Sequence, residues 1–229
     1  MSDISLCFTD TGEGKPLFLL HGNGEDRSIF SRQLEYFSES RRVIAPDTRG
    51  HGRSPRGDAP FTVPQFADDL SALFDELKIE RADVLGFSDG GNIAMYFALK
   101  YPERVDRLIL NGANLRPSGV YAKYQIPIVF EYLAACTASV FDKKAVKKRE
   151  MLSLMVHWPR LTEKEISAIR AKTLVLAGTD DMIKERHTRA IAAAIPSSRL
   201  VFIKGSHFLV GDSPEEYCRT VEAFLLEDK

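Results

Sequence analysis

Short apolar runs alternate with amphipathic stretches along most of the chain. Several runs are almost continuous in Leu, Val and Ile, which is typical of strands buried on both faces of a parallel sheet. The predicted strands, of which the first is weakly marked, are residues 4–8, 16–20, 42–45, 82–87, 107–110, 173–177 and 199–203. Their alternation with helices predicts an α/β class fold with a doubly wound, mostly parallel sheet.

The stretches between these strands carry helical periodicity. Apolar residues recur three and four positions apart between Val63 and Leu77, which predicts a helix with one buried face. A second predicted helix, 90–100, ends before Pro102, because proline disfavours helical backbone in the residue that precedes it. Pro214 is expected to open a last helix.

The interval 114–168 interrupts this alternation with helical, apolar-rich sequence. We predict one domain over residues 1–229, with 114–168 inserted as a small helical lid on the sheet. Ligand pockets are mostly apolar, so part of this surface is expected to line a substrate pocket. The candidate pocket residues are Phe130, Leu133, Phe141 and Trp158, although packing is the simpler role for the single tryptophan.

Composition restricts the classes of partner. Hydrophobic residues make up 44% and charged residues 28%, and the net charge is −1, so no basic field attracts nucleic acid or an anionic membrane. No apolar run approaches the ~20 residues of a membrane span. No secretory signal is visible, and three widely spaced cysteines indicate reduced thiols, so we expect a cytoplasmic protein without a metal site. The basic cluster at 143–149 indicates a solvated helix face or, alternatively, attraction of an anionic substrate.

The sequence Gly86-Phe87-Ser88-Asp89-Gly90 matches the pattern G-x-S-x-G between a predicted strand and a predicted helix. In that context the pattern indicates a sharp strand-to-helix turn that exposes the serine oxygen above a helix N-terminus. Ser88 is therefore the candidate nucleophile.

A serine hydroxyl needs a base, and the base needs a carboxylate to orient it. Among five histidines, His207 is the best candidate base, because it directly follows the strand 199–203. Asp180 and Asp181 follow the strand 173–177, and either could be the carboxylate. The chain order Ser, Asp, His is the order of enzymes with this nucleophile turn.

Backbone N–H groups are expected to stabilise the oxyanion of the reaction. The glycine-rich segment 21–24 follows the strand 16–20, and Asn23 there is the first candidate donor; Asp89, next to the nucleophile, is the second. In a parallel sheet the strand C-termini share one edge, so these segments should meet where ligands of open α/β sheets bind.

The chain resembles the α/β-hydrolase superfamily over nearly its whole length outside the lid. Residues 47–54 resemble the family's D-x-R-G-x-G-x-S loop, 86–91 its nucleophile turn, 174–181 its acid-bearing strand and 205–208 its histidine loop. The resemblance implies a serine hydrolase that needs no cofactor, and it favours Asp181 as the acid. The chain departs from the family's eight-stranded plan in a short N-terminus, expected to lack the first strand, and in a compact lid.

We therefore expect hydrolysis of a small to medium carboxylic ester through an acyl-enzyme, with a small molecule as the partner. Thioesterase, lactonase, carbon–carbon bond hydrolase, perhydrolase and acyltransferase activities use the same residues and remain open. A slow-turnover ligand-binding receptor on this fold is the alternative outside the enzymes.

Overall fold

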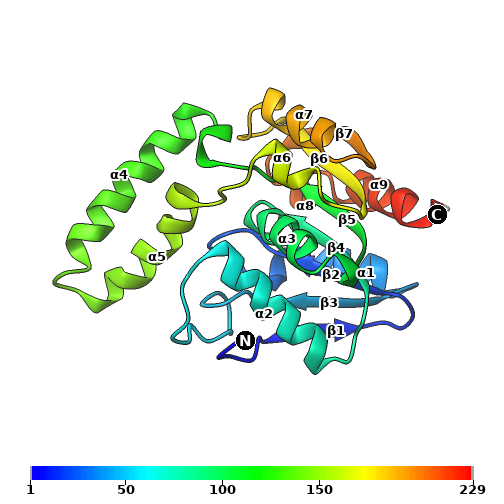
Figure 1. Ribbon diagram of the computed structural model, residues 1–229, viewed down its shortest axis with the longest axis horizontal. Helices are drawn as coiled ribbons and strands as arrows, with labels where there is room; N and C mark the ends of the chain where they lie inside the picture. The colour runs from blue at the N-terminus through cyan, green and yellow to red at the C-terminus, as the bar shows by residue number, and fades with distance from the viewer. Residues whose placement is uncertain (1, 228–229) are drawn as a thin grey trace.

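One seven-stranded sheet forms the centre of the computed structural model, which describes residues 2–227 (Figure 1). The strands lie in the order β1-β3-β2-β4-β5-β6-β7. Their bounds are β1 (Phe8–Thr11), β2 (Pro16–Leu20), β3 (Arg42–Pro46), β4 (Ala82–Phe87), β5 (Val105–Asn111), β6 (Lys172–Asp180) and β7 (Ser198–Ser206). All neighbouring pairs are parallel except β1 with β3, which confirms the predicted mostly parallel sheet.

Helices cover both faces of this sheet. They are α1 (Ser31–Ser38), α2 (Val63–Glu76), α3 (Asp89–Lys100), α4 (Ala122–Ala138), α5 (Lys143–His157), α6 (Glu163–Ile166), α7 (Glu185–Ala194), α8 (Leu209–Asp212) and α9 (Pro214–Leu226), with 3₁₀ turns at Arg27–Phe30, Pro102–Arg104 and Pro117–Gly119. The apolar side chains form two clusters. One contains residues of α2, α3, α6 and α7, and the other contains residues of α1, α8 and α9.

Strand β2 shows why the sheet needs both layers. Phe18 and Leu20 belong to the first cluster, whereas Leu17 and Leu19 belong to the second. Successive side chains of a strand point to opposite faces, so a strand that is apolar at every position must be covered on both sides.

The predicted N-terminal strand at 4–8 is wrong in its position. The strand in that region, β1, begins at Phe8 and pairs antiparallel with β3, with Thr9 opposite Ala45 and Thr11 opposite Val43. It is an edge strand with the sequence Phe-Thr-Asp-Thr, so an apolar pattern does not mark it.

Helices α4 and α5 pack side by side as a hairpin that projects from the sheet domain (Figure 1). This hairpin is shorter than the predicted insertion 114–168, since α6 packs on α3 and α7 in the body of the domain. The hairpin is attached through α5, where Leu154 is buried in the first cluster and Glu150 pairs with Arg56 at 2.7 Å. Within residues 2–227, no helix is both long and apolar enough to cross a membrane.

Candidate active site

Ser88 lies on a sharp turn between β4 and α3. Its backbone has φ 54° and ψ −120°, in a region that few non-glycine residues occupy, and its N–H donates to the Asn111 carbonyl at 2.8 Å. A Cβ atom at Gly86 would lie 2.2 Å from the Gly90 carbonyl oxygen, and one at Gly90 would lie 2.0 Å from the Leu20 carbonyl oxygen. Both glycines of the motif are therefore required by close approach of backbone to backbone.

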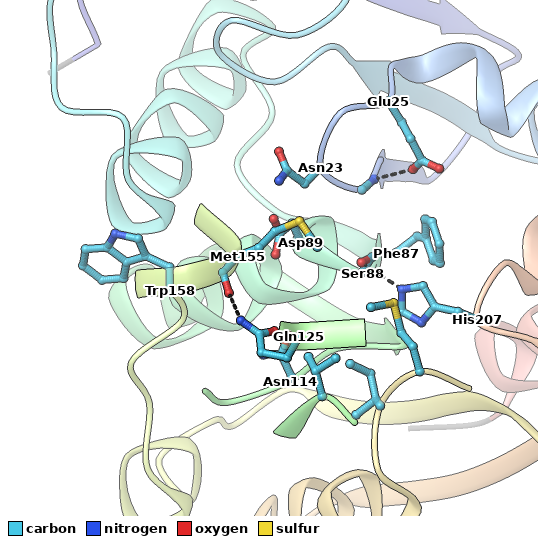
Figure 2. Close-up of a pocket in the computed structure, with 14 residues that line it drawn as sticks. Asn23, Glu25, Phe87, Ser88, Asp89, Asn114, Gln125, Met155, Trp158 and His207 are labelled. Atoms are coloured by element: carbon cyan, nitrogen blue, oxygen red, sulfur yellow. Dashed lines mark hydrogen bonds between the residues drawn. The ribbon is translucent and has the colours of Figure 1, made fainter. Parts of the chain in front are cut away.

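Three of the predicted residues meet at the C-terminal edge of the sheet. His207 follows β7, and its Nε2 lies 2.9 Å from Ser88 Oγ (Figure 2). Its Nδ1 lies 2.7 Å from Asp181 Oδ1, while Asp181 Oδ1 also accepts the Ile183 N–H at 2.8 Å. Asp180 is the last residue of β6 and is exposed. Of the two candidate acids, the structure places Asp181 against the histidine.

Two backbone donors lie beside Ser88. Asn23 and Asp89 both line the cavity around the serine. Among residues 2–227 the Asn23 N–H donates to no other protein group. Asp89 is the first residue of α3, where N–H groups have no partner within the helix. The neighbouring Gly22 N–H is used, because it donates to the Glu25 carboxylate at 3.1 Å.

Ser88 opens into a cavity of about 170 Å³. Its lining residues are Gly22, Asn23, Glu25, Phe87, Ser88, Asp89, Asn114, Val120, Gln125, Met155, Trp158, Met182, Ile183 and His207 (Figure 2). The base of the helical hairpin thus contributes Gln125 from α4 and Met155 from α5, with Trp158 directly after α5.

The predicted pocket residues are corrected by this geometry. Trp158 lines the cavity, but Phe130, Leu133 and Phe141 do not. They are 68%, 55% and 88% exposed on the part of the hairpin that projects from the domain. Their apolar character suggested a pocket, but the apolar core of the sheet domain includes Met151 and Leu154 of α5 and no residue of α4.

Comparison with known proteins identifies the family. The model of the alpha/beta hydrolase fold matches residues 15–135, which is more than half of the chain. The chain belongs to the alpha/beta hydrolase family. A 2-hydroxymuconate semialdehyde hydrolase of Pseudomonas putida is 30% identical over 95% of this chain and 89% of its own length.

Solved structures agree with this family. An enol-lactonase of Burkholderia xenovorans LB400 superposes with a TM-score of 0.79 and 25% identity, over 98% of this chain and 97% of its own. A thermophilic esterase of Thermogutta terrifontis superposes with a TM-score of 0.77 and 27% identity, over 97% and 93%. These relatives are hydrolases, and the fold and the comparisons support hydrolase activity for this chain.

The other histidines of this hydrolase have partners away from Ser88. His21 is buried and accepts the Thr48 N–H at 3.0 Å, and His187 accepts the Leu115 N–H at 2.9 Å. Burial lowers the pKa of His21, and it lowers the pKa values of His51 and His187 to about 4. Histidines with such lowered pKa values stay neutral at neutral pH. His21 and His187 act as structural acceptors, whereas His51 Nδ1 lies against the Arg49 carbonyl oxygen at 2.9 Å. Within residues 2–227, no three His, Cys, Asp or Glu side chains are grouped to hold a metal ion.

The sequence pattern does not predict the polar residues of the cavity wall. Glu25, Gln125 and Asn114 lie in three segments that only the fold brings together. The Asp89 side chain could have been noticed, because it places a carboxyl group directly after the nucleophile. Burial raises the pKa of this carboxyl to about 6, and a hydrogen bond from Asn92 offsets part of the effect.

This raised pKa predicts that Asp89→Asn stabilises the protein at neutral pH. In the unfolded chain the carboxyl ionises near 3.8, whereas in the folded protein it holds its proton up to about 6. Stability is therefore lost as the pH rises between these values, by up to roughly 3 kcal/mol. Urea unfolding should show the variant to be more stable than wild type at pH 7.5, with a smaller difference at pH 4.5. An equal difference at both pH values would contradict this assignment.

Proposed function

We propose that this hydrolase cleaves small to medium carboxylic esters through an acyl-enzyme on Ser88. The observation that carries the proposal is the chain of contacts from Ser88 Oγ to His207 Nε2 at 2.9 Å and from His207 Nδ1 to Asp181 Oδ1 at 2.7 Å. The carboxylate accepts the Nδ1–H, so Nε2 presents its lone pair to the serine hydroxyl. A base in this tautomer can take the proton as Ser88 attacks a carbonyl carbon.

The reaction then proceeds in two halves. His207 takes the Ser88 proton while Oγ bonds to the carbonyl carbon, and the imidazolium returns that proton to the leaving alcohol as the ester C–O bond breaks. In the second half, His207 takes a proton from water, whose oxygen attacks the acyl carbon. The acid product leaves as Ser88 recovers its proton. Asp181 stabilises the imidazolium in both halves.

The oxyanion of each tetrahedral intermediate requires donors that are already in place. We assign the N–H groups of Asn23 and Asp89 to this role, because both lie beside Ser88 and neither has a partner in secondary structure. The Asn23 amide side chain donates to the Met151 carbonyl on α5 at 2.8 Å, which fixes the loop under the hairpin. We propose that the hairpin 122–157 is the lid.

Carbon–carbon bond hydrolysis is the second candidate, since the P. putida relative is a 2-hydroxymuconate semialdehyde hydrolase. That name denotes a carboxylate. Among the described residues, the wall of the cavity contains Glu25 and Asp89 but neither Lys nor Arg, which disfavours a carboxylate substrate. The cavity therefore favours an ester without an anionic group.

Steady-state assays with p-nitrophenyl acetate and 2-hydroxymuconate semialdehyde distinguish these candidates. We expect multiple turnovers of the ester and a kcat/KM for the semialdehyde at least a hundredfold lower. The reverse preference would assign carbon–carbon bond hydrolysis. Stoichiometric binding without turnover of either compound would indicate a receptor on this fold.

The cavity also predicts which side chain sets the acyl chain-length preference. Trp158 lines the cavity, so Trp158→Ala should enlarge it and increase the ratio of kcat/KM for p-nitrophenyl octanoate to that for the acetate several-fold. Each newly buried methylene contributes up to ~0.8 kcal/mol. Phe141→Ala is the matched control, because Phe141 is 88% exposed on the hairpin. A Trp158 variant with the wild-type ratio, or an equal change in the control, would contradict this role.

A further inference from the structure

The Asp89 carboxyl group has a free acceptor beside the nucleophile. It lines the same cavity as Ser88 and His207, as Figure 2 shows. Its Oδ1 accepts the Asn92 Nδ2–H at 2.8 Å, whereas its Oδ2 is buried and accepts no hydrogen bond from residues 2–227. A buried carboxylate oxygen without a donor is costly, so its presence at the reaction site requires an explanation.

Asn92 holds this carboxyl in place but has no further N–H to donate to Asp89 Oδ2. Its other Nδ2–H donates to Asn114 Oδ1 at 3.0 Å, and its Oδ1 accepts the Asn114 N–H at 2.9 Å. Asn92 is fully buried, so its hydrogen bonds to Asp89 and Asn114 are shielded from solvent, although both partners line the cavity. The carboxyl is therefore positioned by a rigid support and retains one acceptor for another group.

The remaining charges of the cavity do not neutralise Asp89. Burial raises the pKa of Asp89 by more than His207, which lies in the same wall, lowers it. The other acid in the wall, Glu25, already accepts the Gly22 N–H at 3.1 Å, and no Lys or Arg of residues 2–227 lines the wall. The lysines of α5 line a neighbouring hollow, which shares Asn23 and Glu25 with the cavity but does not include Asp89. A second buried acceptor, Gln125 Oε1, also lacks a donor among the described residues. The cavity thus offers acceptors and negative charge.

We propose that Asp89 binds a protonated amine of the substrate, and that the substrate class is esters with an ammonium group a few bonds from the scissile carbonyl. The simplest such compounds are aminoacyl esters. This inference rests on the proposed ester hydrolysis. The separation between the ammonium group and the scissile carbonyl follows from the two roles of Asp89. Its N–H is assigned to the oxyanion, and its carboxyl group lies only a few bonds from that N–H.

An ammonium group satisfies this site better than a neutral donor does. It supplies a hydrogen bond to Oδ2 and also the positive charge that a buried carboxylate lacks, and such charge-assisted bonds are roughly twice as strong as neutral ones. Burial raises the pKa of Asp89 to about 6, which agrees with a carboxyl whose charge no Lys or Arg among the described cavity residues balances. A neutral donor such as a hydroxyl leaves the charge unbalanced.

The test compares two esters that differ at one group. The benzyl ester of L-alanine and benzyl isobutyrate differ only in an ammonium group in place of a methyl group. At pH 7 we expect wild-type kcat/KM for the alanine ester to exceed that for the isobutyrate by at least tenfold. In Asp89→Asn the ratio should fall to near one. In the control Glu13→Gln, which removes an exposed acid, it should remain at the wild-type value.

Binding to Ser88→Ala gives a readout that needs no turnover. Calorimetry should show a Kd for the alanine ester at least tenfold lower than for the isobutyrate, and Ser88→Ala/Asp89→Asn should lose this difference. Equal wild-type kinetics and binding for the two esters, or a preference that survives Asp89→Asn, would overturn the proposal. If p-nitrophenyl acetate is turned over but the amine gives no advantage, this inference fails and the ester hydrolase stands. If neither p-nitrophenyl acetate nor the benzyl esters are turned over but the amine preference appears in binding, the amine site stands and the hydrolase assignment fails.

Discussion

Replacing Ser88 with alanine is expected to lower kcat for p-nitrophenyl acetate by about 10⁶-fold, the loss seen when a triad nucleophile is removed. The variant lacks the oxygen that bonds to the acyl carbon, and within residues 2–227 no other side-chain nucleophile lies at hydrogen-bond distance from the His207 ring. The fold should survive, because alanine keeps the Cβ atom and the backbone N–H that donates to Asn111. Circular dichroism and a urea titration check the fold of the same sample.

Ser167→Ala is the matched control for this substitution. Ser167 is exposed, and its hydroxyl donates only to the Lys164 carbonyl within the turn after α6. We expect wild-type kcat from this variant. A Ser88→Ala enzyme that keeps more than a tenth of wild-type kcat would remove Ser88 from the mechanism.

Asp181→Asn is expected to lower kcat by about 10⁴-fold. The Asp181 carboxylate accepts the His207 Nδ1–H at 2.7 Å, and an amide in its place removes the charge that stabilises the imidazolium. An amide NH₂ group turned toward the ring would also favour the wrong tautomer. Steady-state kinetics on p-nitrophenyl acetate measure the loss.

Asp180→Asn provides the comparison for this second substitution. Asp180 is the neighbouring residue and carries the same charge, but it is exposed at the end of β6. Its variant should lose less than tenfold in kcat. A larger loss of kcat in Asp180→Asn than in Asp181→Asn would show that Asp180, and not Asp181, orients His207.

The polarity of the parallel strands made much of the candidate site predictable. Ser88, Asp181 and His207 each follow the C-terminal end of a strand that is marked by a run of apolar residues, and those ends share one edge. That rule does not distinguish Asp180 from Asp181. The choice depends on where β6 stops and on which side chain the following turn directs to His207.

The pocket could not be predicted in the same way. Phe130 and Leu133 are as apolar as core residues, yet both are exposed. The sequence does not show which apolar helix residues become buried, because burial depends on how the hairpin packs against the sheet domain. The polar residues of the cavity wall could not be predicted either, because tertiary packing also brings them together. Asn92 and Asn114 are far apart in the chain, and their hydrogen bonds around Asp89 exist only once β5 and α3 are packed together.

Labelling with a fluorophosphonate tests the central claim most directly, because this reagent phosphonylates a serine oxygen only when a base activates it. Intact-mass measurement of the wild-type protein should show one adduct, and peptide mapping should place it on Ser88. Ser88→Ala should take up no label, and His207→Ala should take it up far more slowly. A wild-type protein that stays unlabelled, or an adduct on any residue other than Ser88, would contradict the account.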